Sequence, residues 1–313
     1  MKCMANNQPV EIIAGPCAID ARNKKDIWRI AQTGVVAKVR FVPAKSRTAY
    51  KAGEFRGVDA PFLERKIKQL VAGKIDLSAS KEEPPSLAWA REFRTKFPKV
   101  GLAMEVMSPS LQLPYYMDKK IFGGGALLVW SPSAQQLGWP LRIMGEFANR
   151  CGWTVGVKNG KWLGERPALA RRNDATVDVE KTWAGLATWA VSANRRGRNI
   201  LIHRGFNAGA ANKNFRNLPI HEIAARMKQE TGLKMFFDPS HSFGAKLRNK
   251  ITDGTLAAMK MVLPNGQYLY DGILIEAAGE HSAQVDTGQH ISIGELETLA
   301  NKIEKVRGLV LPQ

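Results

Sequence analysis

Eight short apolar segments alternate with helical segments along this chain of 313 residues, and this alternation restricts the folds that it can adopt. Short apolar runs between turn residues are typical of buried strands, whereas longer segments with one apolar face are typical of helices. Strands that alternate with helices favour a parallel sheet, and eight such units make a (β/α)8 TIM barrel. The predicted strands are 10–14, 36–42, 102–107, 126–130, 154–157, 199–203, 234–237 and 272–275.

Helices are expected between these strands, and the clearest one follows Pro219. Ile220, Ile223 and Met227 have the spacing of a single apolar helix face, and proline is tolerated just before a helix. The predicted helices are 24–32, 60–72, 86–95, 135–151, 179–193, 220–231 and 293–307. The sequence therefore predicts a single α/β barrel domain over residues 1–313 with surface insertions, a lead-in at 1–9 and no separate regulatory domain.

The composition excludes several classes of protein. Hydrophobic residues make up 44% of the chain, which is enough for a large core and excludes a disordered protein. No apolar stretch approaches the roughly 18 residues of a transmembrane helix, and residues 1–10 lack the apolar segment of a secretory signal. Three cysteines without a CxxC pair indicate a reducing compartment, so we expect a cytoplasmic protein that does not bind membranes.

The net charge of +18 is high, and the basic residues are spread over many short clusters such as 22–25, 91–99 and 195–198. A solvated basic surface is the simplest interpretation of this pattern. Weak attraction to nucleic acid or to an anionic lipid surface is the alternative, although nucleic acid is not the partner that we expect.

Four residues of metal-binding type stand where a predicted strand gives way to a loop. Cys17 follows the first strand, and His241 closes the Asp-Pro-Ser-His segment after the seventh. Glu276 follows the eighth strand, and Asp286 lies in the loop beyond it. Mixed sulfur, nitrogen and oxygen donors suit Mn, Fe, Co or Zn better than Mg or Ca. A lone histidine at a strand end is more often structural, but the four residues together predict a metal site at the barrel mouth.

Basic residues occupy the corresponding ends of other strands. Arg40 lies within the apolar second strand, where a buried guanidinium needs a carboxylate or a bound anion as its partner. Lys158 follows the fifth strand and Arg204 the sixth, each with a glycine close behind it that leaves room for a ligand. The loop after the second strand adds Lys45, Arg47 and Thr48. Because both Arg and Lys bind phosphate, the sequence predicts a pocket for more than one anionic group.

The order of these motifs resembles the class I 3-deoxy-D-arabino-heptulosonate 7-phosphate (DAHP) synthase family. That family shares its barrel with 3-deoxy-D-manno-octulosonate 8-phosphate (KDO8P) synthase. The likeness runs from Ile12 to about Leu299. Its motifs are GPC at 15–17, KSRT at 45–48, KNG at 158–160, RG at 204–205, DPSH at 238–241, IE at 275–276 and Asp286. The Lys-x-Arg-Thr pattern is similar to the DAHP branch, and Cys17 is similar to the cysteine of metal-dependent members.

This resemblance implies an aldol-type condensation of phosphoenolpyruvate with erythrose 4-phosphate, which yields DAHP and phosphate. The reaction is the first step of the shikimate pathway to the aromatic amino acids. Lys45, Cys17 and His241 would be catalytic, with Lys45 as the general acid at the aldehyde oxygen. We also expect a homo-oligomer, either a dimer or a tetramer. The implied ligand sets are Cys17, His241, Glu276 and Asp286 for a divalent Mn, Fe, Co or Zn ion; Arg40, Lys45, Lys158 and Arg204 for phosphoenolpyruvate; and Arg47 and Thr48 for the phosphate of erythrose 4-phosphate.

Two positions depart from the family pattern. Ser46 replaces a proline, which removes rigidity from the loop but no functional group. After the fourth strand, the family's Ile-Gly-Ala-Arg is replaced by Val-Trp-Ser-Pro at 129–132, so an arginine for the phosphoenolpyruvate phosphate is absent and Trp130 stands in place of glycine. Arg142 is a candidate substitute, although a solvated helix face is the simpler expectation for it.

Two alternatives therefore stay open. One is a related phosphoenolpyruvate-using synthase with another aldose acceptor, as in KDO8P or sialic acid synthesis. The other is a non-catalytic basic barrel that binds an acidic partner. Glu105, at the end of the third predicted strand, either orients a water molecule or pairs with one of the cations.

Overall fold

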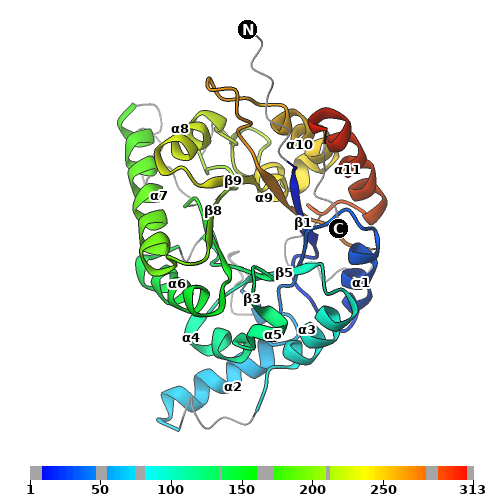
Figure 1. Cartoon of the computed structure of the whole chain (residues 1–313), viewed down its shortest axis with the longest axis vertical. Coiled ribbons are helices and arrows are strands. Elements are labelled where there is room, and N and C mark those ends of the chain that lie inside the picture. The colour runs from blue at the N-terminus through cyan, green and yellow to red at the C-terminus, as the bar shows by residue number, and fades with distance from the viewer. Residues whose placement is uncertain are drawn as a thin grey trace.

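The structure is a computed structural model that describes residues 9–46, 55–74, 82–133, 136–160, 173–208, 212–279 and 288–308. Eight parallel strands close into a barrel in the order β1-β10-β9-β8-β7-β6-β5-β2, and helices surround the ring of strands (Figure 1). The strands are β1 (Glu11–Gly15), β2 (Lys38–Arg40), β5 (Gly101–Glu105), β6 (Leu127–Trp130), β7 (Thr154–Lys158), β8 (Arg198–His203), β9 (Lys234–Phe237) and β10 (Gly272–Glu276). The predicted (β/α)8 barrel is confirmed. A short hairpin of β3 (Lys45–Ser46) and β4 (Phe55–Arg56) is inserted after β2.

All seven predicted helices are present. They are α1 (Lys24–Gln32), α2 (Ala60–Val71), α3 (Pro85–Lys96), α6 (Gly138–Cys151), α7 (Asn173–Ala193), α8 (His221–Thr231) and α11 (Ile293–Arg307). The sequence did not predict α10 (Ile251–Met259) or the short α4 (Pro109–Gln112), α5 (Lys119–Phe122) and α9 (Pro239–Phe243). Gly254 of α10 lets the helix approach Phe243, because a Cβ there would lie 2.0 Å from Phe243 Cζ. In the described part of the chain, no helix is both long enough and apolar enough to cross a bilayer.

The core has two layers, which follow from the alternation of side chains along each strand. In β1, Ile12 and Ala14 belong to the large cluster that packs the strands against the helices, whereas Ile13 belongs to a smaller cluster. That smaller cluster fills the barrel interior with Ile13, Val42, Ala103, Leu128, Trp130, Ile200, Ile202, Phe236 and Leu274. Trp130 is the last residue of β6, so its fully buried indole closes the interior at the carboxyl ends of the strands.

Candidate active site

The carboxyl ends of the barrel strands carry a cluster of buried charges. Arg40, Glu105, Lys158 and Glu276 end β2, β5, β7 and β10, and Asp238 directly follows β9. Each of these five residues is at most 2% exposed. Because all eight strands are parallel, their carboxyl ends meet at one mouth of the barrel, where TIM barrels build their active sites.

Arg40 ends β2, which lies between β1 and β5, and its side chain reaches Glu276 at the end of β10. A Cβ on Gly15 of β1 would lie 2.7 Å from the Arg40 carbonyl oxygen, so this close approach requires glycine. Arg40 Nη2 is 3.3 Å from Glu276 Oε1. Burial opposes the charge of the guanidinium, but Glu276 and other negative groups outweigh burial and raise the pKa of Arg40. None of its three side-chain nitrogens has a hydrogen-bond acceptor among the described residues.

Of the four predicted metal ligands, Glu276 and His241 lie close to each other, and Lys45 links Cys17 to Glu276. Lys45 Nζ donates to Cys17 Sγ at 3.0 Å and lies 3.9 Å from Glu276 Oε1. His241 Nε2 is 3.7 Å from the same oxygen. Asp286, the fourth predicted ligand, lies outside the described residues. Among the residues that are described, no three Cys, His, Asp or Glu side chains are arranged to hold a metal ion.

The Asp-Pro-Ser-His segment at 238–241 orients the His241 side chain and holds the backbone at Glu276. Asp238 caps α9 by accepting from His241 N at 3.1 Å, and its Oδ1 also lies 3.0 Å from His241 Nδ1. Ser240 Oγ accepts from Glu276 N at 2.9 Å. A carboxylate that holds the other ring nitrogen of a histidine is typical of metal-binding histidines. The thiol, imidazole and carboxylate donors therefore fit a transition metal chemically.

Glu105, Lys158 and Trp130 form the opposite part of the mouth. Lys158 Nζ is 3.1 Å from Asp238 Oδ2 and 4.0 Å from Glu105 Oε2. Burial raises the pKa of the Glu105 carboxyl, but Lys45, Lys158 and Arg40 together lower it to about 2. Glu105 is therefore ionised and pairs with two lysines, Lys45 at 4.0 Å and Lys158 at the same distance.

The structure gives Trp130 a role that the sequence analysis missed. Its Nε1 donates to Glu105 Oε2 at 3.0 Å. Its ring centroid is 5.5 Å from Lys158 Nζ and 5.9 Å from the Arg40 guanidinium carbon, so the ring face meets two cations. The sequence signal that could have indicated this role is the position of Trp130 as the last residue of a barrel strand.

Arg204 reaches the mouth from the loop after β8. Gly205 has a φ of 77°, and a Cβ there would lie 2.4 Å from Asn217 O, so the turn after Arg204 requires glycine. Asn159 Oδ1 accepts from Arg204 N at 2.7 Å, and Arg204 Nη1 is 3.3 Å from Asn217 Oδ1. Asn217 also donates to His241 O at 2.5 Å, which joins this loop to the metal-ligand group. Asn217 was not identified from the sequence.

The remaining predicted residues lie elsewhere. Arg47 and Thr48 are outside the described residues, so their predicted contacts with a second phosphate stay a prediction. Arg142 lies on α6 with its side chain 51% exposed, and its Nε is 3.9 Å from Glu146 Oε1. This position matches a solvated helix face rather than a substitute phosphate ligand.

Residues 143–311, a little over half of the chain, match the family model described as DAHP synthetase I family. The chain belongs to this family. The matched part includes Lys158, Arg204, His241, Glu276 and Asp286, whereas the candidate residues up to Thr48 precede it.

Two solved structures share the barrel fold at low sequence identity. The phospho-2-dehydro-3-deoxyheptonate aldolase (DAHP synthase) of Thermotoga maritima is 18% identical, with a TM-score of 0.66 over 96% of this chain and 70% of that one. A truncated 3-deoxy-D-arabino-heptulosonate 7-phosphate synthase of the same organism is 17% identical, with a TM-score of 0.60 over 97% of this chain and 89% of that one. A comparison with curated proteins found no match.

Proposed function

We propose that this member of the DAHP synthetase I family catalyses the metal-dependent condensation of phosphoenolpyruvate with erythrose 4-phosphate. Membership of the family supports the reaction class, an aldol-type synthase that uses phosphoenolpyruvate. The observation that carries the proposal is Arg40, a fully buried guanidinium whose nitrogens have no hydrogen-bond acceptor among the described residues. A buried charge with unused donors is costly unless a ligand engages it, and a phosphate or carboxylate fits the guanidinium fork.

Phosphoenolpyruvate carries both of these anionic groups. Arg40, Lys158 and Arg204 bind them at the mouth, where these side chains are 0%, 1% and 4% exposed. Lys45 completes the ligand set from β3. Arg47 and Thr48, which follow β3 in the sequence, bind the phosphate of erythrose 4-phosphate.

A divalent Mn, Fe, Co or Zn ion is held by Cys17, His241, Glu276 and Asp286. When bound, it supplies a Lewis acid for the aldehyde carbonyl of the acceptor. The support for this ligand set is that His241 lies close to Glu276, that Lys45 contacts both Cys17 and Glu276, and that the Asp238 carboxylate stands behind His241.

The protein's own side chains guide the remaining chemistry. As C3 of phosphoenolpyruvate forms a bond to the aldehyde carbon, the Lys45 ammonium gives a proton to the aldehyde oxygen. Water then adds at C2, the bond from C2 to the phosphate oxygen breaks, and the proton lost by the water leaves with the phosphate. Glu105, with a pKa of about 2, is too weak a base to remove the water proton efficiently, so it orients the water by accepting a hydrogen bond. Arg40 and Lys158 stabilise the negative charge of the substrate groups.

Trp130 favours a second candidate, a synthase of the same type with a different aldose acceptor. Its buried indole occupies the mouth between Arg40 and Lys158, where the family pattern has a glycine. A changed mouth of this kind alters the room for the substrates but keeps the cations that bind phosphoenolpyruvate.

A phosphate-release assay separates these possibilities. The purified protein, loaded with Mn²⁺, is given phosphoenolpyruvate with erythrose 4-phosphate, arabinose 5-phosphate or other aldose phosphates. Release with erythrose 4-phosphate supports the proposal, and release only with another aldose supports the second candidate. Arg204→Ala should raise the KM for phosphoenolpyruvate by roughly tenfold to a hundredfold, since a charged hydrogen bond contributes about 1.5–3 kcal/mol. No release with any acceptor and no binding of millimolar phosphoenolpyruvate would favour the non-catalytic barrel.

A further inference from the structure

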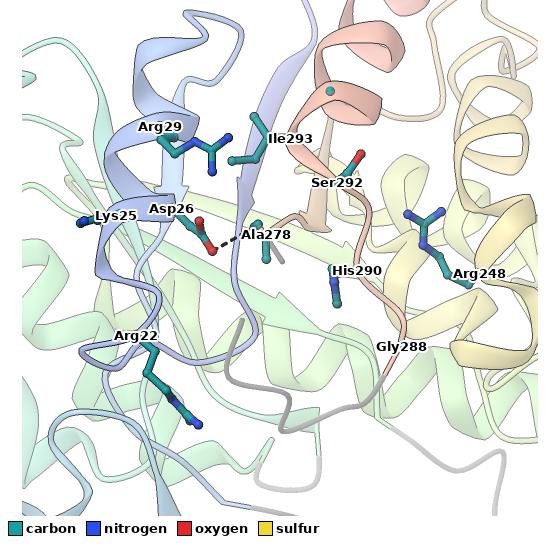
Figure 2. A pocket seen from close by; sticks show the side chains of 12 residues that line it. Arg22, Lys25, Asp26, Arg29, Arg248, Ala278, Gly288, His290, Ser292 and Ile293 are labelled. Carbon is teal, nitrogen blue, oxygen red and sulfur yellow. Dashed lines mark hydrogen bonds between the residues drawn. The ribbon is translucent and has the colours of Figure 1, made fainter. Parts of the chain in front are cut away.

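A second basic cavity lies beside the barrel mouth cluster, between the first and last helices of the barrel. Its volume is about 880 Å³, and α1 faces the start of α11 across it (Figure 2). Its charged and polar lining includes Arg22, Lys25, Arg29, Arg248, His290 and Ser292. None of these residues belongs to the site proposed above.

Cations gather on both sides of this cavity. Arg22, Lys25 and Arg29 follow one another at the spacing of a single helix face and come from α1 and the turn before it (Figure 2). Arg248 stands on the opposite side, where it pairs with Glu295 at 2.8 Å. The acidic residue of the lining, Asp26, is only 7% exposed, and its carboxylate accepts a hydrogen bond from Gly279 N at 2.9 Å (Figure 2).

The cations of α1 are available to a ligand. Arg22 pairs with Asp20 at 2.6 Å on an exposed surface, a contact that contributes little stability. Within the described residues, neither Lys25 nor Arg29 takes part in an ion pair or a hydrogen bond of its side chain. Both side chains are exposed, and Arg29 extends across the cavity toward Ile293 (Figure 2), so an anion in the cavity can reach Arg29 without rearrangement of the core.

The start of α11 adds backbone donors to the same cavity. Ser292 accepts from Glu295 N at 3.2 Å in a capping box, which leaves the amides of Ile293 and Gly294 as the first helix donors without an intrahelical acceptor. Both residues line the cavity, and a Cβ on Gly294 would meet nothing within 4 Å. The positive end of the helix dipole therefore supports the side-chain cations.

We propose that this cavity binds a small phosphorylated molecule at a site separate from the barrel mouth. The volume is in the usual range of small-molecule sites, about 300–1,000 Å³. Arginine, lysine and helix amides together are the donors that recognise a phosphate group. A concave site between two helix ends fits a compact ligand better than an extended nucleic acid strand, which needs a long basic groove with stacking side chains.

The cavity also adjoins the proposed active site. Gly288 and His290 line the cavity, and Gln289 between them is buried and donates to Glu276 Oε2 at 2.9 Å. Gln289 therefore connects the lining of the cavity to Glu276, a proposed metal ligand. Inorganic phosphate is also expected to bind at the barrel mouth. The test for the cavity must therefore locate the ligand by residue and not rely on catalytic activity.

Residue-resolved chemical protection provides this test. The full chain is treated with an acetylating reagent and with phenylglyoxal while inorganic phosphate is varied at constant ionic strength, and modified residues are quantified by mass spectrometry. At phosphate tenfold above its Kd, modification of Lys25 and Arg29 should slow by about tenfold. Lys302, Lys305 and Arg150, which are also exposed, should react at unchanged rates. Equal protection of these controls would mean an adventitious ion only and would overturn the proposal.

A pair of double variants gives an independent measurement. Lys25→Ala with Arg29→Ala should weaken one class of phosphate sites at least about tenfold in isothermal titration, whereas Lys302→Ala with Lys305→Ala should match the wild type. All four side chains are exposed, and circular dichroism checks that both variants fold. Neither variant changes a residue of the barrel mouth, so both should still bind phosphate there. A failure of the cavity proposal can therefore be told apart from a failure of the proposed enzyme function. An unchanged titration in the first variant, or protection by a single-stranded oligonucleotide but not by phosphate, would overturn the proposal.

Discussion

Two buried carboxylates, Glu105 at the barrel mouth and Asp59 before α2, are both 2% exposed but have opposite electrostatic environments. Burial raises the pKa of both carboxyls. At Glu105 the cations of Lys45, Lys158 and Arg40 reverse that effect and bring the pKa to about 2. At Asp59 the opposing groups are the hydroxyl and amide of Ser86, and the pKa stays raised at about 6.

The difference shows what each region is built to do. Asp59 accepts from Ser86 N at 2.9 Å, and Ser86 Oγ lies 2.6 Å from the Tyr116 hydroxyl, so this network joins α2 to α3 through hydrogen bonds without a charged partner for Asp59. The mouth instead concentrates charge: Arg40, Lys45, Lys158 and Arg204 face Glu105, Asp238 and Glu276 among its described residues. A structural network of this size needs no such excess of cations, whereas a site for an anionic substrate does.

The largest expected effect is the loss of activity on metal removal, which should depend on the residues of the mouth and not on the Asp59 network. Chelation should abolish phosphate release from phosphoenolpyruvate and erythrose 4-phosphate, because the proposed Lewis acid is lost, and Mn²⁺ should restore it. His241→Ala should not recover with Mn²⁺, whereas Asp59→Asn should respond to the metal as the wild type does. Full turnover in the presence of the chelator would show that the proposed metal ligands have another role.

The next effect concerns stability. Lys158→Met removes the buried cation that lies between Asp238 and Glu105 and leaves them only Lys45, His241 and Arg40, so the free energy of unfolding should fall by about 3–5 kcal/mol in urea denaturation. Lys66→Met is a matched control, because Lys66 is also buried but pairs with Glu82, whose side chain is 42% exposed, at 3.3 Å. Its loss should be about 1 kcal/mol or less. Equal losses in the two variants would mean that the mouth is no more dependent on paired charge than the surface.

Sequence patterns were sufficient for the barrel and for most of the residues at its mouth. Apolar runs report buried parallel strands directly, so all eight strands and the charged residues that end them could be found. Helix α10 was not predicted, because a glycine such as Gly254 is typical of a loop. Only the packing of the Phe243 ring against the helix explains this glycine.

The pairings within the mouth were not predictable. Trp130 Nε1 donates to Glu105 on the neighbouring strand β5, and Asn217 joins Arg204 to the segment of His241. Such contacts depend on side-chain directions between segments that are distant in the sequence, and spacing along the chain does not encode them. Asp59 was missed for the same reason, since its partner Ser86 belongs to another helix.

The pH dependence of stability tests the Asp59 side of the comparison. Its folded pKa of about 6 lies above the unfolded value of 3.8, so the folded state keeps a proton that the unfolded state releases. The associated stability is fully present below the unfolded value and is lost as pH rises through about 6. Two pKa units correspond to about 3 kcal/mol. Asp59→Asn cannot ionise, so its unfolding free energy should gain about 2.5 kcal/mol relative to wild type between pH 4 and pH 7. A difference that is constant with pH would contradict the raised pKa.

The smallest expected effect isolates one hydrogen bond at the mouth. Trp130→Phe keeps an aromatic face near Lys158 and Arg40 but removes the Nε1 donor of Glu105. Trp153 offers a matched control, because it is also fully buried and its Nε1 has no hydrogen-bond partner among the described residues. Both substitutions lose similar ring volume, so the cavity costs are comparable. A hydrogen bond to a charged group contributes about 1.5–3 kcal/mol, so urea denaturation should show Trp130→Phe to be less stable than Trp153→Phe by roughly that amount. Trp130→Phe should also lower kcat/KM for phosphoenolpyruvate, since Glu105 loses one of the contacts that fix its position. If the two variants unfold with the same free energy, the indole is only a filler of the barrel, and the mouth does not depend on its N–H group.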